Sequence, residues 1–176
     1  LTDNLSLLYK VEKADFLLNI KRIDLNKMLE EKKQEISTMA YNKKSVKINF
    51  DVNLSKQFYF LDEAMLMRVL DNILYNSLRF TTSGEIKLEV HDEADGHSNK
   101  IYFKCMDTGI GFKQKDTSVL FKAFYQDDQY KNHVGLGLYI SKKIVNNYDG
   151  EIWAYNNEKG GATVEFYIKV LSNYLL

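Results

Sequence analysis

Apolar side chains recur along residues 62–81 at the three- and four-residue spacing of an amphipathic helix, with no glycine or proline inside the stretch. The expected buried side comprises Leu66, Val69, Leu70, Ile73, Leu74, Ser77 and Phe80. Asn72, Asn76 and Arg79 recur at helical spacing on an adjoining face, where two amides and a guanidinium have no apolar purpose. A polar face in contact with water explains these three residues taken alone, so their interpretation depends on the rest of the chain.

The chain before this helix predicts two more helices and three short strands. Residues 1–16 carry leucines at heptad-like spacing, which is typical either of an N-terminal amphipathic helix or of the end of a longer coiled coil, and both interpretations stay open. A helix is expected from about Asp24, a suitable N-cap, to about Tyr41. The expected strands are residues 18–25, 45–52 and 57–61, after which Asp62 is expected to cap the next helix.

The chain after this helix predicts four strands and one helix. The expected strands are residues 85–91, 100–106, 151–155 and 163–170. A polar hairpin loop over residues 92–99 is expected to join the first two, and the helix is expected between Val134 and Gly150. Residues 107–134 are expected to be irregular, which in a compact domain is typical of a functional loop or of disorder. Because the strands alternate in polarity, we expect an α/β layered domain in which one mixed sheet carries helices on one face.

Composition and charge narrow the function without naming it. At 176 residues, of which 45% are hydrophobic, the chain can bury one core, with or without an appendage. Its 24 basic and 24 acidic residues give a net charge of zero, so no basic field favours nucleic acid or an anionic membrane. The single cysteine, Cys105, lies in an apolar run, which predicts a buried structural thiol and a reducing, cytoplasmic setting. No run reaches membrane-spanning length and the chain begins with leucine, so we interpret it as a fragment of a longer protein.

Three segments of the chain carry glycines in places suited to a ligand. In Asp107-Thr108-Gly109-Ile110-Gly111, the carboxylate can accept a hydrogen bond from an exocyclic amine, and the glycines let the backbone approach a flat ring or a phosphate. Gly135-Leu136-Gly137-Leu138 opens a helix, where unpaired amides and the helix dipole favour an anion. Gly160-Gly161-Ala162-Thr163 lies between two expected strands. Taken alone, each segment is also explained by an ordinary turn or helix start.

Five segments taken in order are more specific than any one of them. They are Asn72…Asn76…Arg79-Phe80-Thr81, Asp107-x-Gly109-x-Gly111, Phe121-Lys122-Ala123-Phe124, Gly135-Leu136-Gly137-Leu138 and Gly160-Gly161-x-Thr163. The series spans about residues 60–170 and resembles the ATP-binding catalytic domain of sensor histidine kinases of two-component systems, in the GHKL superfamily. Residues 1 to about 29 resemble the end of the dimerisation hairpin and its connector, so we expect a division into 1–22 and a catalytic domain at 23–176. The resemblance implies the Bergerat ATP-binding fold, a two-layer α/β sandwich with ATP between the helix at 62–81, the sheet and a mobile lid.

The resemblance assigns the nucleotide contacts residue by residue. Asp107 matches the carboxylate that recognises the adenine amine. Asn76 matches the amide that holds Mg²⁺ against the triphosphate, with support from Asn72, and an amide oxygen is a hard ligand that suits magnesium. Arg79 matches a position that reaches the phosphates, and Phe80 matches the aromatic residue beside the nucleotide. The remaining ATP contacts are Gly109, Gly111 and Thr163 at the adenine end, Gly135, Leu136, Gly137 and Leu138 at the phosphates, and in the lid the hydrophobic anchors Phe121 and Phe124 and the cation Lys131.

Two positions depart from the family pattern. His133 stands where relatives often carry a further glycine, so an imidazole is expected beside the phosphate loop. Gln126 stands where many relatives carry arginine, which leaves Lys131 or Lys122 to supply the positive charge of the lid. Both departures concern the lid rather than the adenine or magnesium positions.

Asn72 separates the branches of the superfamily. In the chaperone, topoisomerase and mismatch-repair ATPases that share the fold, a glutamate one helical turn before the magnesium asparagine acts as general base on water. An amide cannot take a proton at neutral pH, so rapid hydrolysis is disfavoured. The γ-phosphoryl group is then expected to await a nucleophile from another element, while this domain supplies positioning and charge neutralisation.

None of the three histidines in the sequence fits the acceptor of that phosphoryl group. His91 is expected at the end of a strand, His97 in a loop and His133 in the lid, whereas the acceptor of the family lies on an exposed dimerisation helix. The resemblance implies transfer from ATP to a histidine upstream of Leu1, and from there to an aspartate of a response-regulator receiver domain. It also implies a homodimeric parent protein and a cytoplasmic domain of a membrane-anchored bacterial sensor.

Two other functions stay open at this point. One is a nucleotide-binding or pseudokinase module, which His133 favours and which the intact Asn76, Asp107 and paired glycines disfavour. The other is a protein Ser/Thr kinase of the same fold. The helical pattern of residues 1–16 favours the histidine kinase over the Ser/Thr kinase.

Overall fold

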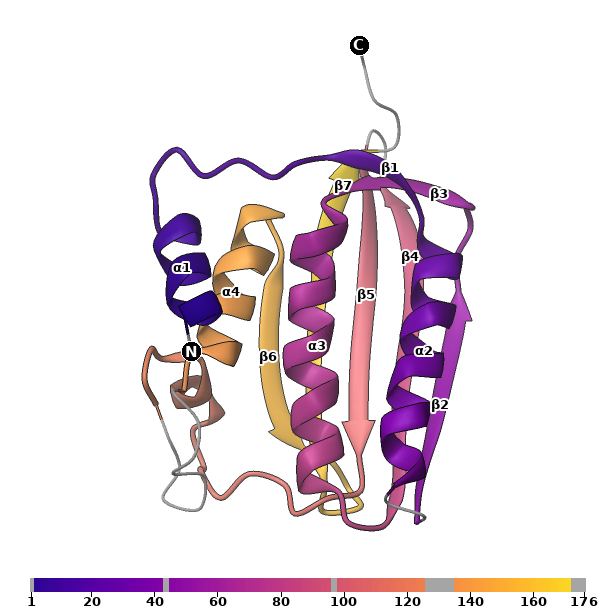
Figure 1. Cartoon of the computed structure of the whole chain (residues 1–176). Helices are drawn as coiled ribbons and strands as arrows, with labels where there is room; N and C mark the ends of the chain where they lie inside the picture. Colours follow the sequence, from indigo (N-terminus) through magenta and orange to yellow (C-terminus); the bar gives the residue numbers. More distant parts are fainter. Residues whose placement is uncertain (1, 43–44, 96–97, 126–134, 172–176) are drawn as a thin grey trace.

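The computed structural model describes residues 2–42, 45–95, 98–125 and 135–171. At its centre is a five-stranded sheet in the order β2-β4-β5-β7-β6 (Figure 1). The strands are β2 Val46–Asn53, β4 Gly84–Asp95, β5 Ser98–Asp107, β6 Glu151–Asn156 and β7 Ala162–Leu171. β2 and β4 pair in parallel and the other neighbours pair antiparallel, which confirms the predicted mixed sheet.

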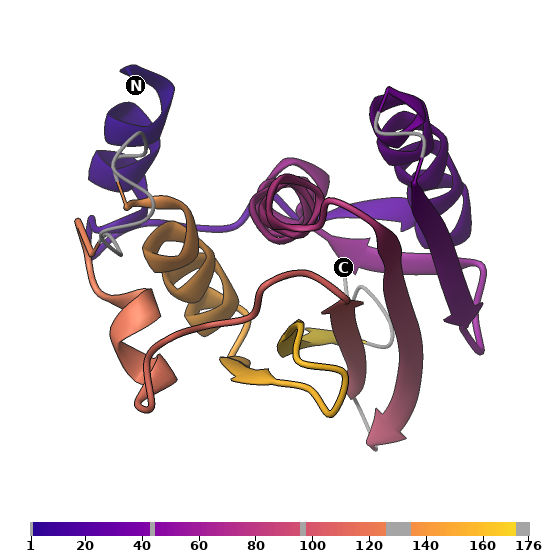
Figure 2. The ribbon, with the colours of Figure 1, turned by 90° about the horizontal axis from the view of Figure 1, so that it is seen from below.

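The helices are α1 Thr2–Val11, α2 Leu25–Tyr41, α3 Glu63–Phe80 and α4 Gly137–Asn147, and a short 3-10 helix, η1 Thr117–Phe121, interrupts the stretch predicted to be irregular. The longer helices cover a single face of the sheet, and the N-terminal helix packs beside them against α4 (Figures 1 and 2). α3 crosses the middle of the sheet, with α4 towards β6 and α2 towards β2 (Figure 2). The predicted two-layer α/β fold is therefore confirmed. Within the described ranges, each helix is too short or too polar to cross a membrane.

The core lies between α3 and the inward face of the sheet. Leu66, Leu70 and Ile73 are at most 2% exposed, as predicted for the apolar side of this helix. Beneath them, the rings of Phe103 on β5 and Phe166 on β7 stack with centroids 4.5 Å apart. β5 alternates between half-buried and buried residues along its whole length, because the helices cover one of its two faces.

Asp62 fixes the point at which α3 begins. Its Oδ1 accepts a hydrogen bond from the N–H of Met65 at 3.1 Å, which confirms the predicted N-cap. Its Oδ2 accepts from the N–H of Asn19 at 2.9 Å, and its own N–H donates to the phenol of Tyr148 at 2.7 Å. The start of α3 is thus tied to the connector after α1 and to the end of α4.

The predicted polar loop over residues 92–99 is wrong. β4 runs to Asp95 and β5 begins at Ser98, and the two strands pair with each other up to these two residues. The polar residues are accommodated because Asp92 has partners outside the ladder: it accepts from the N–H of Ser55 at 2.8 Å and from the phenol of Tyr59 at 2.8 Å. A polar segment therefore extends the sheet here instead of ending it.

The strand predicted at residues 18–25 is shorter and belongs to a second sheet. β1 Lys21–Asp24 pairs antiparallel with β3 Phe58–Leu61 in a two-stranded ribbon, whereas one sheet was predicted. Alternating polarity identifies a strand but does not name its partner. The first helix also ends earlier than predicted, at Val11.

Candidate functional site

A cavity of about 300 Å³ lies between α3, the start of α4 and the adjoining ends of β5 and β7. Among the residues predicted from the sequence, those that line it are Asn72, Asn76, Phe80, Asp107, Gly111, Gly135, Leu136, Gly137 and Leu138. Ala162, from the last of the five sequence segments, lines it as well. Four of the five segments therefore meet around one hollow of the size that small-molecule sites have.

Asp107 presents one carboxylate oxygen to this cavity. The side chain is 4% exposed, and its Oδ1 accepts from the N–H of Gly109 at 3.0 Å and from the N–H of Ala162 at 2.9 Å. Among the described residues, none donates a hydrogen bond to Oδ2. Because a buried carboxylate oxygen needs a donor, Oδ2 is the atom left to accept from a ligand such as an exocyclic amine.

Two glycines allow the backbone to close around Asp107. A Cβ at Gly161 would lie 2.0 Å from the carbonyl oxygen of Asp107, and a Cβ at Gly109 would lie 2.4 Å from the carbonyl oxygen of Phe80. Both distances are far inside van der Waals contact, so a side chain at either position would push the backbone apart. The segment at 160–163 is therefore more than a hairpin turn, since its second glycine lies against the main chain of Asp107.

Asn72 fastens α3 to the first turn of α4. Its Nδ2 donates to the carbonyl oxygen of Gly137 at 2.9 Å and lies 3.0 Å from the Ser141 hydroxyl, which itself donates to the same carbonyl. The amide nitrogen is thus engaged by the protein, and Oδ1 is the atom that Asn72 has left for a ligand. Asn72, which the family resemblance predicts as a site residue, lines the cavity and also holds one wall of it.

Asn76 and the start of α4 offer polar groups that the protein does not use. The half-buried side chain of Asn76 lines the cavity, and its amide makes no hydrogen bond with any residue in the described ranges. Leu136 stands at the N-cap of α4 and provides no side-chain cap, so among the described residues no side chain caps the first N–H groups of that helix. A helix start of this kind favours an anion, and an amide oxygen beside it is suited to a hard cation.

Other predicted residues lie outside the cavity lining. The exposed guanidinium of Arg79 lies over the ring of Phe80, 5.4 Å from its centroid. Thr163 is fully buried beneath the adenine end predicted for the site. Lys131 and the departures at Gln126 and His133 fall outside the described residues.

The two predicted hydrophobic anchors have different environments. Phe121 is 5% exposed at the end of η1, as an anchor should be. Phe124 is 59% exposed with φ at +59°, and its N–H donates to the carbonyl oxygen of Gly135 at 3.1 Å. The prediction of Phe124 as an anchor is therefore wrong, because its contribution is a backbone contact with the start of the glycine segment rather than burial of its ring.

Tyr75 lines the cavity and was missed by the sequence reasoning. Its phenol donates to Oε1 of Glu35 at 2.6 Å, and the buried ammonium of Lys32 contacts Glu35 at 2.5 Å and Asp71 at 2.6 Å. Burial and the hydrogen bond to Glu35 raise the pKa of Tyr75 to about 12. This group links α2 to the helix that carries the two asparagines. The contacts between the two helices join residues about 40 apart in sequence, so helical periodicity does not reveal them.

The charges of this group support one another. Burial opposes the charged form of Lys32, but the hydrogen bonds to Asp71 and Glu35 outweigh it, so the pKa of Lys32 lies above its ordinary value. The hydrogen bonds from Lys32 and Tyr75 hold the pKa of Glu35 below its ordinary value. At neutral pH the lysine and Glu35 are therefore ionised and paired.

α1 also reaches the cavity. Asn4 is among the lining residues, and its Oδ1 accepts from the guanidinium of Arg68, one helical turn before Asn72. Directly after α1, the carboxylate of Glu12 accepts from the phenol of Tyr139 on α4. The leucine spacing of residues 1–16 predicted the helix, but it did not predict which surface the helix would cover.

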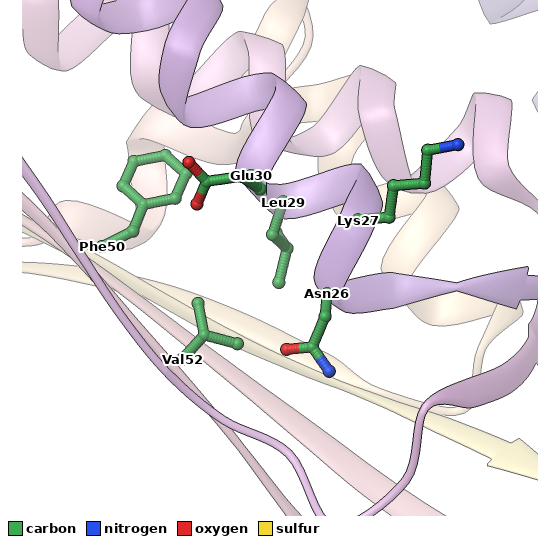
Figure 3. A pocket seen from close by; sticks show the side chains of 6 residues that line it. All are labelled: Asn26, Lys27, Leu29, Glu30, Phe50 and Val52. Atoms are coloured by element: carbon green, nitrogen blue, oxygen red, sulfur yellow. The ribbon is translucent and has the colours of Figure 1, made fainter.

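A second hollow, of about 440 Å³, lies between α2 and β2 (Figure 3). It is lined by Asn26, Lys27, Leu29, Glu30, Phe50 and Val52. Figure 3 shows Lys27 pointing away from the hollow, which leaves apolar side chains with one amide and one carboxylate around it. None of the five sequence segments reaches it, so we place the candidate site in the cavity beside α3.

The sequence matches a known family over most of this region. Residues 61–172 match the family described as histidine kinase-, DNA gyrase B- and HSP90-like ATPase. Sensor histidine kinase SpaK of Bacillus subtilis is 34% identical over 161 residues, which cover 89% of this chain and 34% of that protein. Sensor histidine kinase WalK of Bacillus subtilis (strain 168) is 33% identical over 113 residues, 60% of this chain and 18% of that protein. The chain thus spans between 18% and 34% of the length of these relatives.

The fold matches solved structures of the same class. The crystal structure of full-length ShkA in complex with AMPPNP superposes with a TM-score of 0.82 at 23% identity, over 99% of this chain and 36% of that one. At this identity the likeness concerns the fold. It includes the N-terminal helix and connector as well as the sheet and its helices, because nearly the whole chain is covered.

Proposed function

The chain belongs to the histidine kinase-, DNA gyrase B- and HSP90-like ATPase family as the ATP-binding catalytic domain of a histidine kinase, and we propose that it transfers the γ-phosphoryl group of ATP to a histidine. The acceptor is expected on a dimerisation helix of the parent protein, outside this chain. From there the phosphoryl group passes to an aspartate of a response-regulator receiver domain, the phosphorelay of a two-component system. The homodimeric parent, its membrane anchor and the cytoplasmic placement of this domain are parts of the same proposal.

The observation that carries the proposal is the set of unused polar atoms around one cavity. Oδ2 of Asp107, the amide of Asn76 and the uncapped start of α4 face it from three directions. These groups complement an exocyclic amine, a hard cation and an anion, which are the three recognisable parts of magnesium-bound ATP. A cavity for an apolar ligand would not leave three such groups without protein partners.

The residues present fit a magnesium ion shared with the phosphates. Asn76 would hold it through an amide oxygen, and Asn72 would supply Oδ1 beside it. When bound, the ion neutralises phosphate charge. The remaining proposed contacts follow the sequence assignment, with Arg79, Gly135, Leu136, Gly137 and Leu138 at the phosphates, Gly109, Gly111 and Thr163 at the adenine end, Phe80 beside the nucleotide, and Phe121, Phe124 and Lys131 in the lid.

The geometry favours transfer over hydrolysis. The residue one turn before Asn76 is Asn72, whose amide cannot take a proton from water and whose Nδ2 is bound to Gly137 and Ser141. A water molecule near the phosphates therefore finds no base at this position. The domain contributes by binding and orienting ATP, and the attacking nitrogen must come from another part of the protein.

We also propose that residues 1–22 are the end of a dimerisation helix with its connector, and that residues 23–176 are the catalytic domain. α1 packs on α4, Val11 at its end is 4% exposed, and Glu12 directly after it accepts a hydrogen bond from Tyr139 of α4. The connector ends at β1, whose pairing with β3 brings it to the start of α3. An element that carries the acceptor histidine would then continue from a helix already docked beside the cavity.

The test is phosphorylation of the parent protein with ATP labelled at the γ-phosphate. We expect label that is stable in alkali and lost in acid, as phosphohistidine is, and little of it in Asn76→Ala. Asn147→Ala is the matched control, because its amide donates to the carbonyl oxygen of Lys143 on the exposed side of α4 and it should label normally. ATP binding without any acid-labile label in the unaltered protein would contradict transfer and leave a nucleotide-binding module.

A further inference from the structure

The side chain of Asn157 is the centre of the turn between β6 and β7. Its Nδ2 donates to the carbonyl oxygens of Asp107 at 2.9 Å and of Ala162 at 3.2 Å. Its Oδ1 accepts from the N–H groups of Lys159 and Gly161, both at 3.1 Å. The orientation of the amide is fixed, because reversing it would place Nδ2 against the two N–H groups and Oδ1 against the two carbonyl oxygens.

This turn holds Asp107 at two points. Asn157 binds the main-chain oxygen of Asp107 directly, and it also binds the backbone of Gly161 and Ala162, where β7 begins beside Asp107. The N–H of Ala162 donates to Oδ1 of Asp107 at 2.9 Å, which turns Oδ2 towards the cavity. The backbone and the carboxylate of Asp107 are thus both set by one amide that lies 50 residues away in sequence.

We propose that Asn157 is a positioning residue that gives the site its preference for a 6-aminopurine. It does not line the cavity, so it acts through Asp107. A hydrogen bond to a carboxylate weakens steeply when donor and acceptor lose their alignment, so the contribution of the amino group depends on how firmly Asp107 is held. This inference rests on the proposed binding of ATP and adds the residue that makes the binding selective.

The test compares ATP with purine riboside triphosphate, which lacks only the 6-amino group. Binding of each to the whole chain is measured by calorimetry with magnesium present. We expect the unaltered chain to prefer ATP by roughly ten-fold or more, the worth of one hydrogen bond to a charged group. Asn157→Asp keeps the size of the side chain but places an oxygen against two carbonyl oxygens. In this variant the affinities for the two nucleotides should differ by less than about three-fold, while purine riboside triphosphate binds nearly as before.

Two further variants separate positioning from general damage. Asp107→Asn should lose the preference by itself, and the Asp107→Asn, Asn157→Asp double variant should lose no more, because the two residues act through one contact. Asn147→Asp is the matched control and should keep the full preference, since its amide also donates to a backbone carbonyl but lies at the end of α4. Continued binding of purine riboside triphosphate shows in each case that the variant is folded.

The outcomes also separate the inference from the proposed function. If the unaltered chain binds neither nucleotide, the proposed function fails and the inference falls with it. If the unaltered chain prefers ATP and Asn157→Asp keeps that preference, the inference is overturned and the proposed function stands. Equal weakening of both nucleotides in Asn157→Asp also overturns the inference, because Asn157 would then support the turn without aligning Asp107.

Discussion

Replacing Gly161 by alanine should displace Asp107. The added Cβ would lie 2.0 Å from the carbonyl oxygen of Asp107, about 1.4 Å inside the distance at which ordinary van der Waals contact begins. Because the obstacle is main chain and not the end of a flexible side chain, the turn and β5 must move apart. Overpacking of this kind lowers the free energy of unfolding by about 1–3 kcal/mol. It also weakens the hydrogen bond from Ala162 that orients the carboxylate.

Gly150→Ala provides a matched control, because Gly150 stands directly before β6 as Gly161 stands directly before β7. Its added Cβ would lie 1.9 Å from the carbonyl oxygen of Tyr167, but this clash is away from the cavity. Urea denaturation followed by the fluorescence of Trp153, the single tryptophan of the chain, measures the stability of both variants. Calorimetry under conditions in which both remain folded measures ATP affinity.

We expect similar losses of stability in the two variants and a loss of ATP affinity in Gly161→Ala alone, by roughly ten-fold, the worth of one hydrogen bond to a carboxylate. The reasoning would be refuted if folded Gly161→Ala bound ATP as tightly as folded Gly150→Ala. The close approach at Gly161 would then be a matter of packing without consequence for the site.

Three further predictions concern the helices and the core. Lys32→Met leaves two partly exposed carboxylates without their cation, so we expect a loss of about 1–2 kcal/mol in urea denaturation. Pairing lowers the pKa of Glu35, so its contribution to stability is present above the ordinary pKa of 4.5 and is lost as the pH falls through the lowered pKa of the folded chain. The difference in unfolding free energy between the unaltered chain and Lys32→Met should therefore shrink below that lowered pKa, and a difference that is constant with pH contradicts the pairing. Asn72→Ala removes the hydrogen bonds from the Asn72 amide to α4, so it should lower the free energy of unfolding by about 1–2 kcal/mol and weaken ATP binding. Normal ATP binding would show that the site does not depend on these hydrogen bonds. Burial raises the pKa of Cys105 to about 12, so at about pH 8 a thiol reagent should label it only at the rate of unfolding, and rapid labelling of the folded chain would count against its burial.

The sequence was most informative where local rules decide the structure. The apolar face of α3 and the cap at Asp62 follow from helical spacing and from a side chain that can accept from the third residue onward. The buried thiol of Cys105 follows from the apolar run around it, and the structure confirms it at 2% exposure. These features need no knowledge of distant partners.

The sequence was least informative where partners lie far apart along the chain. The sequence predicts a polar loop at Asp92, because its partners Ser55 and Tyr59 are more than thirty residues away along the chain. Asn157 escaped notice because its role depends on Asp107, which only the pairing of β5 with β7 brings near. Periodicity and turn chemistry describe one segment at a time, whereas these contacts exist only after the sheet has formed.

The candidate site shows both situations together. The glycines and asparagines were found because their spacing is itself the signal, and nine of the predicted residues line the cavity. The spacing of Arg79 predicts its face of α3 but not the direction of its guanidinium, which lies over the Phe80 ring because packing sets the direction of a side chain at the end of a helix. Its contact with the phosphates stays a prediction. Tyr75 was missed for the same reason, since its place at the cavity depends on Glu35 of α2.

Titration of this chain with magnesium and ATP by calorimetry, beside the Asp107→Asn variant, tests the central claim most directly. We expect one ATP bound per chain and a loss of roughly ten-fold or more in affinity when the carboxylate becomes an amide, because a charged acceptor for the adenine amine is removed. Equal affinity of the two proteins would contradict the placement of adenine at Asp107. Absence of ATP binding by the unaltered chain would contradict the site as a whole.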